Sequence, residues 1–429
     1  MNSRRAFIRK SAGLAGAFAL TPLAAHALAD DISDALRALN KLPFDQSLTD
    51  EDLWSRIAQA YTASPNILNL NNGGVSPQPK VVQDAVDRYY HLSNEAPTYY
   101  MWQILDKGRE PLRRKLADLA GTSPEEVCIN RNTTEALGIV TYGLSLNRGD
   151  EIVMTRQDYP NMIHAWRQKE MREGIKIKWI NLNLPVENDE VVLREFVNAT
   201  TSKTKIWHIT HMINWTGQIL PVKKLCEEAR KRNILSIVDG AHTFAHMDFK
   251  VSDFNPDYYG TSLHKWLSAP FGTGMLYVKR ENIPGLYPIF PNDKPTDNNI
   301  RKFESLGTRS FAPEQAIGQA IDFHLAIGAK RKEERLRYLK NYWCEKVMKH
   351  PRVRLHVSLK PEYSCALGTF SIDGLDPVDV VNRLFNDFQI HTTAIKWENI
   401  SCVRVTPHVY TLTRDLDRFA EAVLKIAAS

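Results

Sequence analysis

The chain has 429 residues, of which 43% are hydrophobic and 24% are charged, proportions typical of a folded globular protein. This length is sufficient for one large domain with a sizeable core and a smaller second domain. The net charge is +6, but residues 1–10 contribute four basic side chains and no acidic one. Without these four charges the net charge falls to +2, which gives no support to a nucleic-acid partner.

The N-terminal segment has the pattern of a twin-arginine export signal. Arg4 and Arg5 form the arginine pair, a weakly apolar stretch follows, and residues 27–29 offer a small-residue cleavage site. We therefore predict that residues 1–29 are a signal peptide, that the twin-arginine export machinery is a partner, and that the mature protein is periplasmic. A membrane anchor or a disordered basic tail is the alternative. The stretch is too short and too weakly apolar to span a bilayer comfortably, and no other run is long enough.

The five cysteines do not follow a disulfide or metal-binding pattern. They are Cys128, Cys226, Cys344, Cys365 and Cys402, with no Cys-x-x-Cys pair and no regular spacing. An odd number of scattered cysteines in an exported chain argues against a disulfide framework. We expect most of them to be buried as small apolar side chains.

After the signal, residues 30–64 are expected to be largely helical, and residues 67–79 form an extended segment followed by a glycine- and proline-containing loop. From about residue 80 to 280, helix-length segments alternate with short apolar strands. The predicted strands are Val127–Asn130, Glu151–Thr155, Ile175–Leu182, Lys205–His211, Ile234–Asp239 and Met275–Val278. Because strands separated by helices are joined by parallel crossovers, we expect an α/β fold with a mostly parallel sheet covered by helices.

A polar break at residues 291–302 separates this region from a different pattern. Beyond the break, a long charged helix is predicted over residues 314–348, followed by short strands and a final helix over residues 415–428. We therefore predict a large domain over residues 65–300. A smaller α+β domain is predicted to comprise residues 30–64 and 301–429.

Chemically distinctive residues follow the ends of the predicted strands. Asp239 lies at one such end, residues 132–135 follow another, and residues 158–166 follow a third. Ligands of parallel sheets bind at the carboxyl ends of the strands. These side chains are therefore expected to converge on one crevice.

Lys265 and Asp239 indicate the chemistry of that crevice. Lys265 is flanked by Leu263 and Trp266, which favours a partly buried lysine with a depressed pKa. An imine-forming lysine and a carboxylate that holds a protonated ring nitrogen are what a pyridoxal 5′-phosphate (PLP) enzyme requires. The alternative is that Asp239 caps a helix and that Lys265 is a solvated surface residue.

Other residues could complete a PLP site. His242 could hydrogen-bond the phenolic oxygen of the ring, and Ser262 and His264 could donate to the phosphate. Thr133 and Thr134 open a predicted helix whose N-terminus would bind an anion. The same letters would equally form an ordinary helix cap with a capping box.

Two other chemistries are weaker. His208 with His211, or His242 with His246, could be imagined as zinc ligands. Histidines three apart on a strand project to opposite faces, which is poor geometry for chelation, so no metal is expected. Nicotinamide binding is weaker still, because no Gly-x-Gly-x-x-Gly follows a strand.

At these residues the chain resembles the class V aminotransferase group of fold type I PLP enzymes, which includes cysteine desulfurases and isopenicillin N epimerase-like proteins. The resemblance covers roughly residues 65–425. The motifs that carry it are Asn132-Thr133-Thr134-Glu135, Asp158-Tyr159-Pro160 with Trp166, Asn214-x-x-Gly217, Asp239-Gly-Ala-His242, Ser262-Leu-His264-Lys265, Gly307-Thr308 and Val403-Arg404-Val405-Thr406 with Tyr410.

The resemblance implies a role for each cofactor-binding residue. Lys265 is the catalytic lysine that forms the Schiff base, and Thr133, Thr134, Ser262 and His264 bind the phosphate. The remaining contacts to the cofactor are Tyr159 stacking on the ring, Asn214 close to it, Asp239 at the pyridine nitrogen and His242 at the phenolic oxygen.

Two further residues concern the substrate and a second subunit. The resemblance implies that Arg404 grips the substrate α-carboxylate, for which a bidentate guanidinium fork is suited. Thr308 is implied to reach the phosphate of a neighbouring subunit, so a homodimer with shared active sites is expected.

The chain departs from the desulfurases of this group at two points. Desulfurases carry a histidine where this chain has Tyr159, and a nucleophilic cysteine on a loop before the carboxylate-binding arginine. Here residues 391–400 are a short segment without cysteine, and Cys402 is expected on a strand. Sulfur abstraction is therefore not expected.

The resemblance implies an enzyme that acts on the amino group or Cα of a small amino-acid-like substrate. Transamination is the leading hypothesis, with epimerisation or lyase chemistry as the alternative and ligand binding without turnover as the second alternative. Free amino acids are scarce outside the cytoplasm, so a secreted or envelope-bound amino compound is expected. The resemblance includes periplasmic PLP enzymes that tailor pyoverdine-type siderophores, which suggests a role in siderophore biosynthesis.

Overall fold

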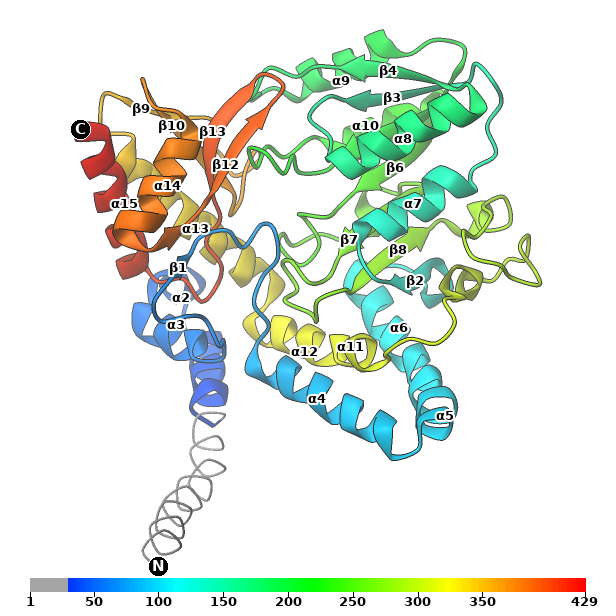
Figure 1. Cartoon of the computed structure of the whole chain (residues 1–429), viewed down its shortest axis with the longest axis horizontal. Coiled ribbons are helices and arrows are strands. Elements are labelled where there is room, and N and C mark those ends of the chain that lie inside the picture. The colour runs from blue at the N-terminus through cyan, green and yellow to red at the C-terminus, as the bar shows by residue number, and fades with distance from the viewer. Residues whose placement is uncertain (1–29) are drawn as a thin grey trace, which may run out of the picture.

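Two β-sheets of unequal size organise the chain (Figure 1). The computed structural model describes residues 30–429, so the predicted signal peptide lies outside the described residues. A seven-stranded sheet occupies one side of the molecule and a four-stranded sheet the other. A short parallel pair, β1 (Leu68–Asn69) with β11 (Ile390–His391), accompanies the smaller sheet.

The larger sheet has the strand order β2-β8-β7-β6-β5-β3-β4. Its strands are β2 (Val127–Asn130), β3 (Glu151–Thr155), β4 (Lys176–Ile180), β5 (Thr204–Thr210), β6 (Leu235–Asp239), β7 (Tyr258–Ser262) and β8 (Gly274–Val278). Only β8 runs antiparallel to its neighbours β2 and β7, and the other pairs are parallel. The expected α/β fold with a mostly parallel sheet is therefore confirmed.

Two features of this sheet were not anticipated. Strand β7 was missed because its segment Tyr-Tyr-Gly-Thr-Ser is not the aliphatic run that indicates a buried strand, although all five residues are buried. Strand β8 is antiparallel because residues 263–273 provide too short a connection for a crossover helix. The loop that carries Lys265 is this connection.

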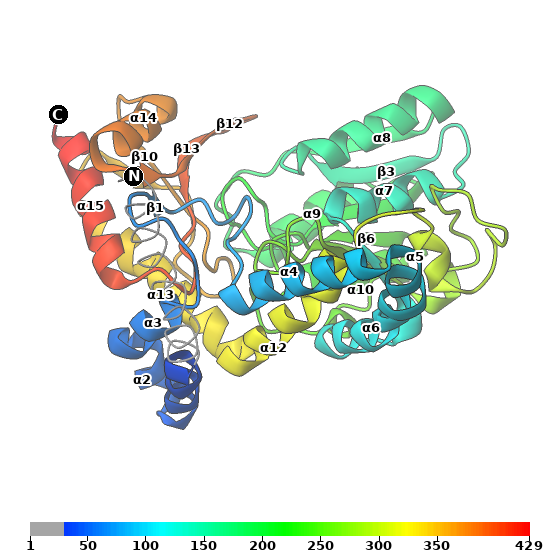
Figure 2. The ribbon, with the colours of Figure 1, turned by 60° about the horizontal axis from the view of Figure 1, so that its bottom comes forward.

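Helices cover both faces of the larger sheet, because alternate strand residues point to opposite sides. Ile129 faces one apolar core and Cys128 faces the other. Helices α7 (Thr133–Gly143) and α8 (Pro160–Glu173) cover one face. The other face is covered by α4 (Lys80–Glu95), α6 (Asp106–Ala120), α9 (Asp189–Ala199), α10 (Val222–Lys231) and α12 (Ile317–Ile327). Figure 2 shows α8 on one side of the sheet and α4, α6 and α12 on the other.

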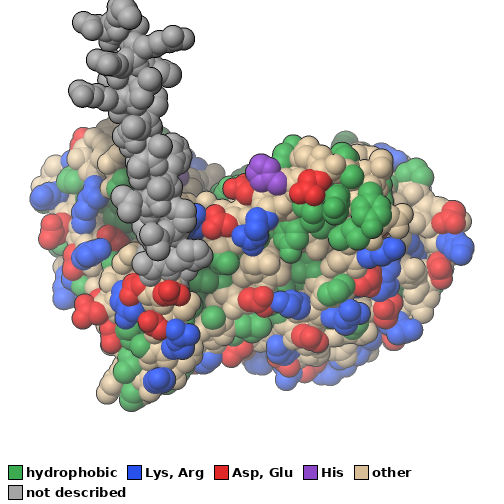
Figure 3. Space-filling model, turned by 90° about the horizontal axis from the view of Figure 1, so that it is seen from below, with side chains coloured by type: hydrophobic (Ala, Val, Ile, Leu, Met, Phe, Trp, Pro, Cys, Tyr) green, Lys and Arg blue, Asp and Glu red, His purple; other side chains and the backbone are tan. Residues whose placement is uncertain are grey.

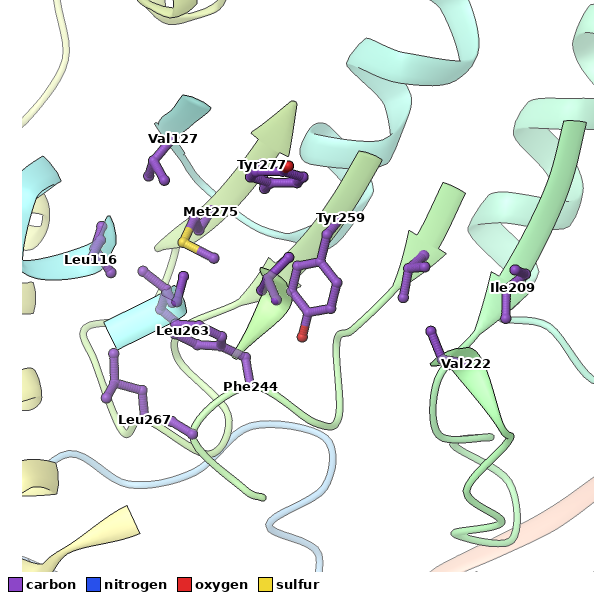
Figure 4. Close-up of a cluster of buried hydrophobic side chains, with 14 of the residues drawn as sticks. Leu116, Val127, Ile209, Val222, Phe244, Tyr259, Leu263, Leu267, Met275 and Tyr277 are labelled. Carbon is purple, nitrogen blue, oxygen red and sulfur yellow. The ribbon is translucent and has the colours of Figure 1, made fainter. Parts of the chain in front are cut away.

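The core under the site joins this second helical layer to the loop that follows β7 (Figure 4). Tyr259 and Met275 project from β7 and β8 toward Leu263, Phe244 and Leu267. All five side chains are buried in one cluster. Burying such side chains stabilises a fold by about 1.5–3 kcal/mol each, so the base of the Lys265 loop is firmly packed.

The smaller sheet is antiparallel, with the order β12-β13-β10-β9. Its strands are β9 (Val353–Leu355), β10 (Gly368–Ile372), β12 (Thr393–Trp397) and β13 (Ile400–Val405). Helices α13 (Ala329–Val347), α14 (Pro377–Phe388) and α15 (Thr413–Ala428) pack with it. The apolar core of this unit includes Trp343, Phe370 and Phe419.

The N-terminal segment is helical, as expected. Residues 30–41, α2 (Phe44–Thr49) and α3 (Glu51–Ala58) are helices, and Trp54 packs in one cluster with Trp266 and Leu336. A further turn, α5 (Pro97–Tyr99), continues into a π-helix at Tyr100–Leu105. Short 3₁₀ helices occur at Pro124–Glu126, Val251–Asp253, Arg280–Asn282 and Ile300–Glu304.

The packing differs from the expected domain boundary at two places. The helix predicted over residues 314–348 is split into α11 (Ala312–Gln315), α12 and α13, and Gly328 adopts a φ of 91° between the last two. Helix α12 contributes Ala320 and Ile321 to the core of the large sheet, whereas β1 pairs with the smaller unit. The first half of α12 therefore packs with the large sheet, and the division into two domains stays a prediction.

The surface is of mixed charge on the face shown in Figure 3, where Lys and Arg side chains intermingle with Asp and Glu. Nucleic acids bind continuous basic surfaces, and this mixture does not provide one there. Among the helices in residues 30–429, none is long and apolar enough to cross a membrane.

Candidate active site

A cavity of about 370 Å³ lies where the carboxyl edge of the large sheet meets the hairpin β12–β13. Most of the predicted site residues line it. These are Thr133, Thr134, Tyr159, Asn214, His242, Ser262, His264, Lys265 and Arg404. The cavity is also lined by Gly73, Gly74, Asn132, Trp215, Thr393 and Ile395. Residues from both sheets therefore form one site.

Lys265 is held on the loop between β7 and β8. The amide of Leu263 donates to the carbonyl of Thr273 at 3.0 Å, and the amide of Ala269 donates to the carbonyl of Leu263 at 3.1 Å. Burial lowers the pKa of Lys265 to about 8, with the charge of Arg404 acting in the same direction and that of Asp239 opposing it. A lysine with this pKa is partly uncharged near neutral pH and can act as a nucleophile.

His242 is the direct neighbour of that lysine. Its Nε2 lies 3.1 Å from Nζ of Lys265, and its Nδ1 is buried with no hydrogen-bond partner in the described part of the chain. Burial and the charge of Lys265 hold the pKa of His242 well below its usual value. The ring is therefore neutral, with an unused position that fits the phenolic oxygen of a cofactor.

Asp239 ends β6 and is 4% exposed. Its Oδ1 accepts a hydrogen bond from the amide of Ala241 at 2.9 Å. Burial raises the pKa of this carboxyl, and the charge of Lys265 opposes the rise. Within residues 30–429, no basic side chain forms an ion pair with it. A protonated pyridine nitrogen would supply the missing positive charge and stabilise the carboxylate form.

The first turn of α7 and the end of β7 form a cup of hydroxyl and amide groups. Oγ of Ser262 accepts from the amide of Thr133 at 3.0 Å and lies 2.7 Å from its hydroxyl. The helix-cap interpretation also holds, because Oδ1 of Asn132 accepts from the amide of Glu135 at 2.9 Å. A helix N-terminus with adjacent hydroxyl groups is suited to a phosphate.

His264 stands at the edge of this cup. Its Nδ1 lies 3.0 Å from the carbonyl oxygen of Thr273, so Nδ1 is the donor and Nε2 remains for a ligand. Burial lowers the pKa of His264 to about 4, and the charge of Lys265 adds to this effect. A bound phosphate would oppose both effects and allow Nε2 to donate as well.

Gly274 explains how closely β8 approaches the cup. A Cβ at this position would lie 2.4 Å from Oδ1 of Asn130 and 2.6 Å from the amide nitrogen of Asn132. Such contacts are far inside the van der Waals limit, so only glycine fits. The backbone of β8 is thus pressed against the residues that precede α7.

Tyr159 immediately precedes α8 and is 42% exposed at the cavity. Its position is set by Asp158, which is fully buried. Oδ2 of Asp158 accepts from the amide of Thr155 at 2.8 Å, and Oδ1 accepts from the hydroxyl of Thr210. The turn that presents Tyr159 is therefore tied to the ends of β3 and β5, which suits a ring-stacking residue.

Arg404 projects from β13 and is 7% exposed. Its Nη1 donates to the carbonyl of Asn214 at 2.8 Å and its Nη2 to Oδ1 of Asn71 at 2.9 Å, while Nε has no partner in the described residues. Its guanidinium forms no ion pair with an acidic side chain within residues 30–429, and burial lowers its pKa to about 10. Burying an uncompensated charge is costly, so this site calls for an anionic ligand.

Thr308 is not brought to the cavity. It is exposed on the loop that follows Glu304, and its neighbours Gly307 and Arg309 line a separate surface depression. Its implied role lies in a neighbouring subunit, so contact with the phosphate of another chain stays a prediction.

Several residues of the site were missed by sequence reasoning. Asn71, Gly73 and Gly74 come from the segment after β1, where the amide of Gly73 donates to Oγ1 of Thr406 at 2.9 Å. The paired glycines were a signal of close backbone approach. Trp215 and Ile395 had no comparable signal, because apolar residues are usual in any core.

Among the described residues, the cavity wall contains neither a cysteine nor a group of metal-binding side chains. All five cysteines are buried and free, as expected, and none lines the cavity. Burial also raises the pKa of the Cys402 thiol to about 12, so it is not a thiolate nucleophile. Groups of three or more metal-binding side chains are not found in residues 30–429.

The chain matches the class-V aminotransferase family over residues 68–418. It is 28% identical to an isopenicillin N epimerase from Amycolatopsis lactamdurans over 393 residues, 87% of this chain and 98% of that protein. It is also 28% identical to a probable cysteine desulfurase from Halalkalibacterium halodurans over 399 residues, 87% of this chain and 96% of that protein.

A similar fold occurs in the solved structure of a C-DES mutant in which glycine is covalently linked to the PLP cofactor. The TM-score is 0.77 at 22% identity, over 85% of this chain and 98% of that chain. The family is PLP-dependent, and Lys265, Asp239, the unused Nδ1 of His242 and the anion cup fit that cofactor. The chain therefore belongs to the class-V aminotransferase family.

Proposed function

We propose that this chain is a PLP-dependent enzyme that acts on the amino group and Cα of an amino-acid-like substrate, in an aminotransferase-type reaction. The observation that carries the proposal is Arg404, a buried cation without a carboxylate partner in the described residues, in the same cavity as Lys265. An α-carboxylate bound at Arg404 would place the amino-bearing carbon of a substrate beside this lysine.

The cofactor, when bound, supplies an electron sink that weakens the bonds to Cα. The protein residues then have separate tasks. Arg404 orients the substrate through its carboxylate, and Lys265 removes and returns the proton at Cα as a general base with a pKa of about 8. Asp239 holds a proton on the ring nitrogen, and Tyr159 covers the ring and excludes water.

The composition of the cavity wall favours transamination. Its titratable side chains are Tyr159, His242, His264, Lys265 and Arg404. Transamination needs one base to move a proton, and Lys265 is suited to that task. Epimerisation needs a second acid–base group on the opposite face of Cα, and this wall offers only Tyr159 for it. Desulfuration needs a thiolate, which the wall does not contain.

Epimerisation is the second candidate, because the chain is similar to an isopenicillin N epimerase and Tyr159 could serve as the second acid–base group. Ligand binding without turnover is less well supported. A protein that had lost activity would not be expected to keep the lysine, the aspartate, the phosphate cup and the arginine together.

The test uses purified protein loaded with PLP and a panel of amino acids in D₂O. A lysine-bound cofactor gives a visible absorbance band, and Lys265→Ala should abolish it. Conversion of the cofactor to its amine form with release of a keto acid supports transamination. Deuterium exchange at Cα without that conversion supports epimerisation, and a colourless wild-type protein overturns the cofactor assignment.

We also propose that the enzyme acts after export, in the periplasm, on a secreted amino compound such as a siderophore of the pyoverdine type. The arginine pair Arg4-Arg5 supports this proposal. Replacing both arginines with lysine should leave the protein in the cytoplasmic fraction. If mass spectrometry showed that the enzyme left amine-bearing siderophore precursors unchanged, the siderophore role would be abandoned.

A further inference from the structure

The wall of the cavity that faces the large sheet is a strip of alternate residues on β12. Thr393 and Ile395 line the cavity, and Trp397 follows on the same face of the strand. Cross-strand pairing sets Thr393 opposite Arg404 and Ile395 opposite Cys402. The strip therefore begins at the carboxylate-binding arginine and becomes apolar with distance from it.

An aromatic pair ends this strip. The rings of Trp215 and Trp397 are stacked, with centroids 5.2 Å apart and planes inclined by 21°. Trp215 lines the cavity and directly follows Asn214, whose carbonyl accepts from Arg404. Its Nε1 is buried and has no partner among residues 30–429. One face of the indole is thus covered by Trp397, and the ring retains an unused donor.

The hairpin that carries this wall is fastened to the large sheet. Nε1 of Trp397 donates to the carbonyl of Arg156 at 2.8 Å. Oδ1 of Asn399 accepts from Nε2 of Gln157 at 3.2 Å, and its Nδ2 donates to the carbonyl of Leu182 at 3.3 Å. These contacts bridge the two sheets beside the cavity, so the wall is formed before a ligand arrives.

The distance along β12 from Thr393 to Trp397 gives the length of this strip. Strands rise about 3.3 Å per residue, so the four steps from Thr393 to Trp397 span about 13 Å. Trp397 therefore lies beyond the cavity-lining residues Thr393 and Ile395 along β12, and Trp215 stacks on it from the other side of the cavity wall. Thr393, Ile395 and Trp215 carry no charge, so a second carboxylate would find no cation at this end.

We propose that Thr393, Ile395 and Trp215 form a subsite for a flat, apolar group on the side chain of the substrate. The proposal rests on the proposed function, because it takes Arg404 as the anchor of the substrate carboxylate. The substrate class is an amino acid whose side chain carries an aromatic or similarly flat group. A short aliphatic amino acid would not reach this subsite. A dicarboxylic amino acid would place its second carboxylate there without a cation to pair with.

Binding of unreactive carboxylates to the PLP-loaded protein tests the subsite without turnover. The probes are 4-phenylbutanoate, butanoate and glutarate, measured by isothermal titration calorimetry. Burying a phenyl ring against this wall should make 4-phenylbutanoate bind about tenfold to a hundredfold more tightly than butanoate. Equal binding of the two, or tighter binding of glutarate, overturns the subsite.

Variants separate this proposal from the carboxylate anchor. Trp215→Ala should remove the preference for 4-phenylbutanoate over butanoate, whereas Trp215→Phe should keep most of that preference. Ile395→Ala provides a second test if Trp215→Ala does not fold, and it should reduce the preference by a few fold. Arg404→Ala should weaken all three probes. If Arg404→Ala leaves every probe bound as before, the proposed function fails; if only the Trp215 and Ile395 variants have no effect, the subsite fails.

Discussion

The side-chain nitrogen of Lys265 lies 3.1 Å from Nε2 of His242, and burial of both groups sets the charge state of this pair. Two cations this close would repel each other. Burial lowers the pKa of both groups, that of Lys265 to about 8 and that of His242 well below its usual value. The pair therefore carries at most one positive charge near neutral pH, and that charge resides on the lysine.

This charge state predicts how cofactor uptake depends on pH. Only uncharged Lys265 reacts with an aldehyde, so the rate of PLP incorporation into cofactor-free protein should rise about tenfold per pH unit and level off above about pH 8. Stopped-flow absorbance measures the rate, and a small primary amine in solution corrects for titration of PLP itself. A rate that keeps rising to about pH 10 would show that the lysine has an ordinary pKa.

Arg404→Lys is expected to impair substrate binding. The guanidinium of Arg404 donates to Asn214 and Asn71 and has further N–H groups for a carboxylate. The single ammonium group of a lysine cannot make all of these hydrogen bonds in the same planar geometry. We expect KM for amino acid substrates to rise about tenfold to a hundredfold with a smaller change in kcat. Reaction with an amine that lacks a carboxylate serves as the control and should be unaffected. An unchanged KM would remove Arg404 from the substrate site.

Gly274→Ala is expected to damage the phosphate cup. The added methyl group would overlap Oδ1 of Asn130 and the amide of Asn132, and relieving such a clash costs about 1–3 kcal/mol. Both the free energy of unfolding in urea and the affinity for PLP should fall. Gly318→Ala is the matched control, because α12 has open space at that position. There alanine should be neutral or stabilise the helix by up to about 1 kcal/mol.

Glu304→Gln is expected to destabilise the protein strongly. Oε1 of Glu304 accepts from Arg113 at 2.5 Å and from the amide of Ile129 at 2.7 Å, and Oε2 lies 2.7 Å from Arg109. Breaking a buried ion pair on one side costs about 3–5 kcal/mol. Glu110→Gln is the control, because its carboxylate is partly exposed. Similar losses for the two variants in urea unfolding would contradict this reasoning.

The contribution of the Glu304 carboxylate to stability depends on pH. Burial raises the pKa of Glu304, but hydrogen bonding and charge from Arg113, with the charge of Arg109, outweigh burial and lower it below the usual value. The unfolded state therefore binds the proton more readily, and the stabilisation is lost as the pH falls through the folded-state pKa. The stability difference between wild type and Glu304→Gln should shrink in acid.

Lys332 lies beneath the site and donates to the carbonyl of Trp266, the residue after Lys265. It is 2% exposed, and burial lowers its pKa to about 7. Between this value and the pKa of an unfolded lysine, the unfolded chain binds more protons. The free energy of unfolding should therefore rise with pH by about 1 kcal/mol per unit across that range.

Lys332→Met should remove this slope, which is visible by comparing urea unfolding of variant and wild type from about pH 7 to about pH 10. Lys349→Met is the control at an exposed position and should leave the slope unchanged. Parallel curves for wild type and Lys332→Met would show that Lys332 does not titrate in this range.

Local patterns were sufficient for much of the fold. Strands β2 and β3 begin and end at the predicted residues, because short apolar runs bounded by polar turns are decided by nearby sequence. The antiparallel direction of β8 depends on the length of the preceding loop, and β7 lacks the aliphatic run that would reveal it. The helix predicted over residues 314–348 is interrupted at Gly328, and this break depends on the packing of α12 against α6 and α4.

The candidate site divides in the same way. Lys265, Asp239 and His242 stand in motifs whose residue types alone indicate a cofactor. Asn71 contacts Arg404 across 333 residues of sequence, and no local pattern links the two. Trp215 and Ile395 look like ordinary core residues until the hairpin β12–β13 is placed beside them.

The sequence by itself determined the fold class, the family resemblance and the chemical groups of the site, because periodicity, turn residues and short motifs act over a few positions. Tertiary structure decided the pairing of β1 with β11, the neighbours of Arg404 and the wall formed by Ile395 and Trp215. These features arise from contacts between segments far apart in the chain. Their burial and charge depend on which surfaces meet when both sheets pack.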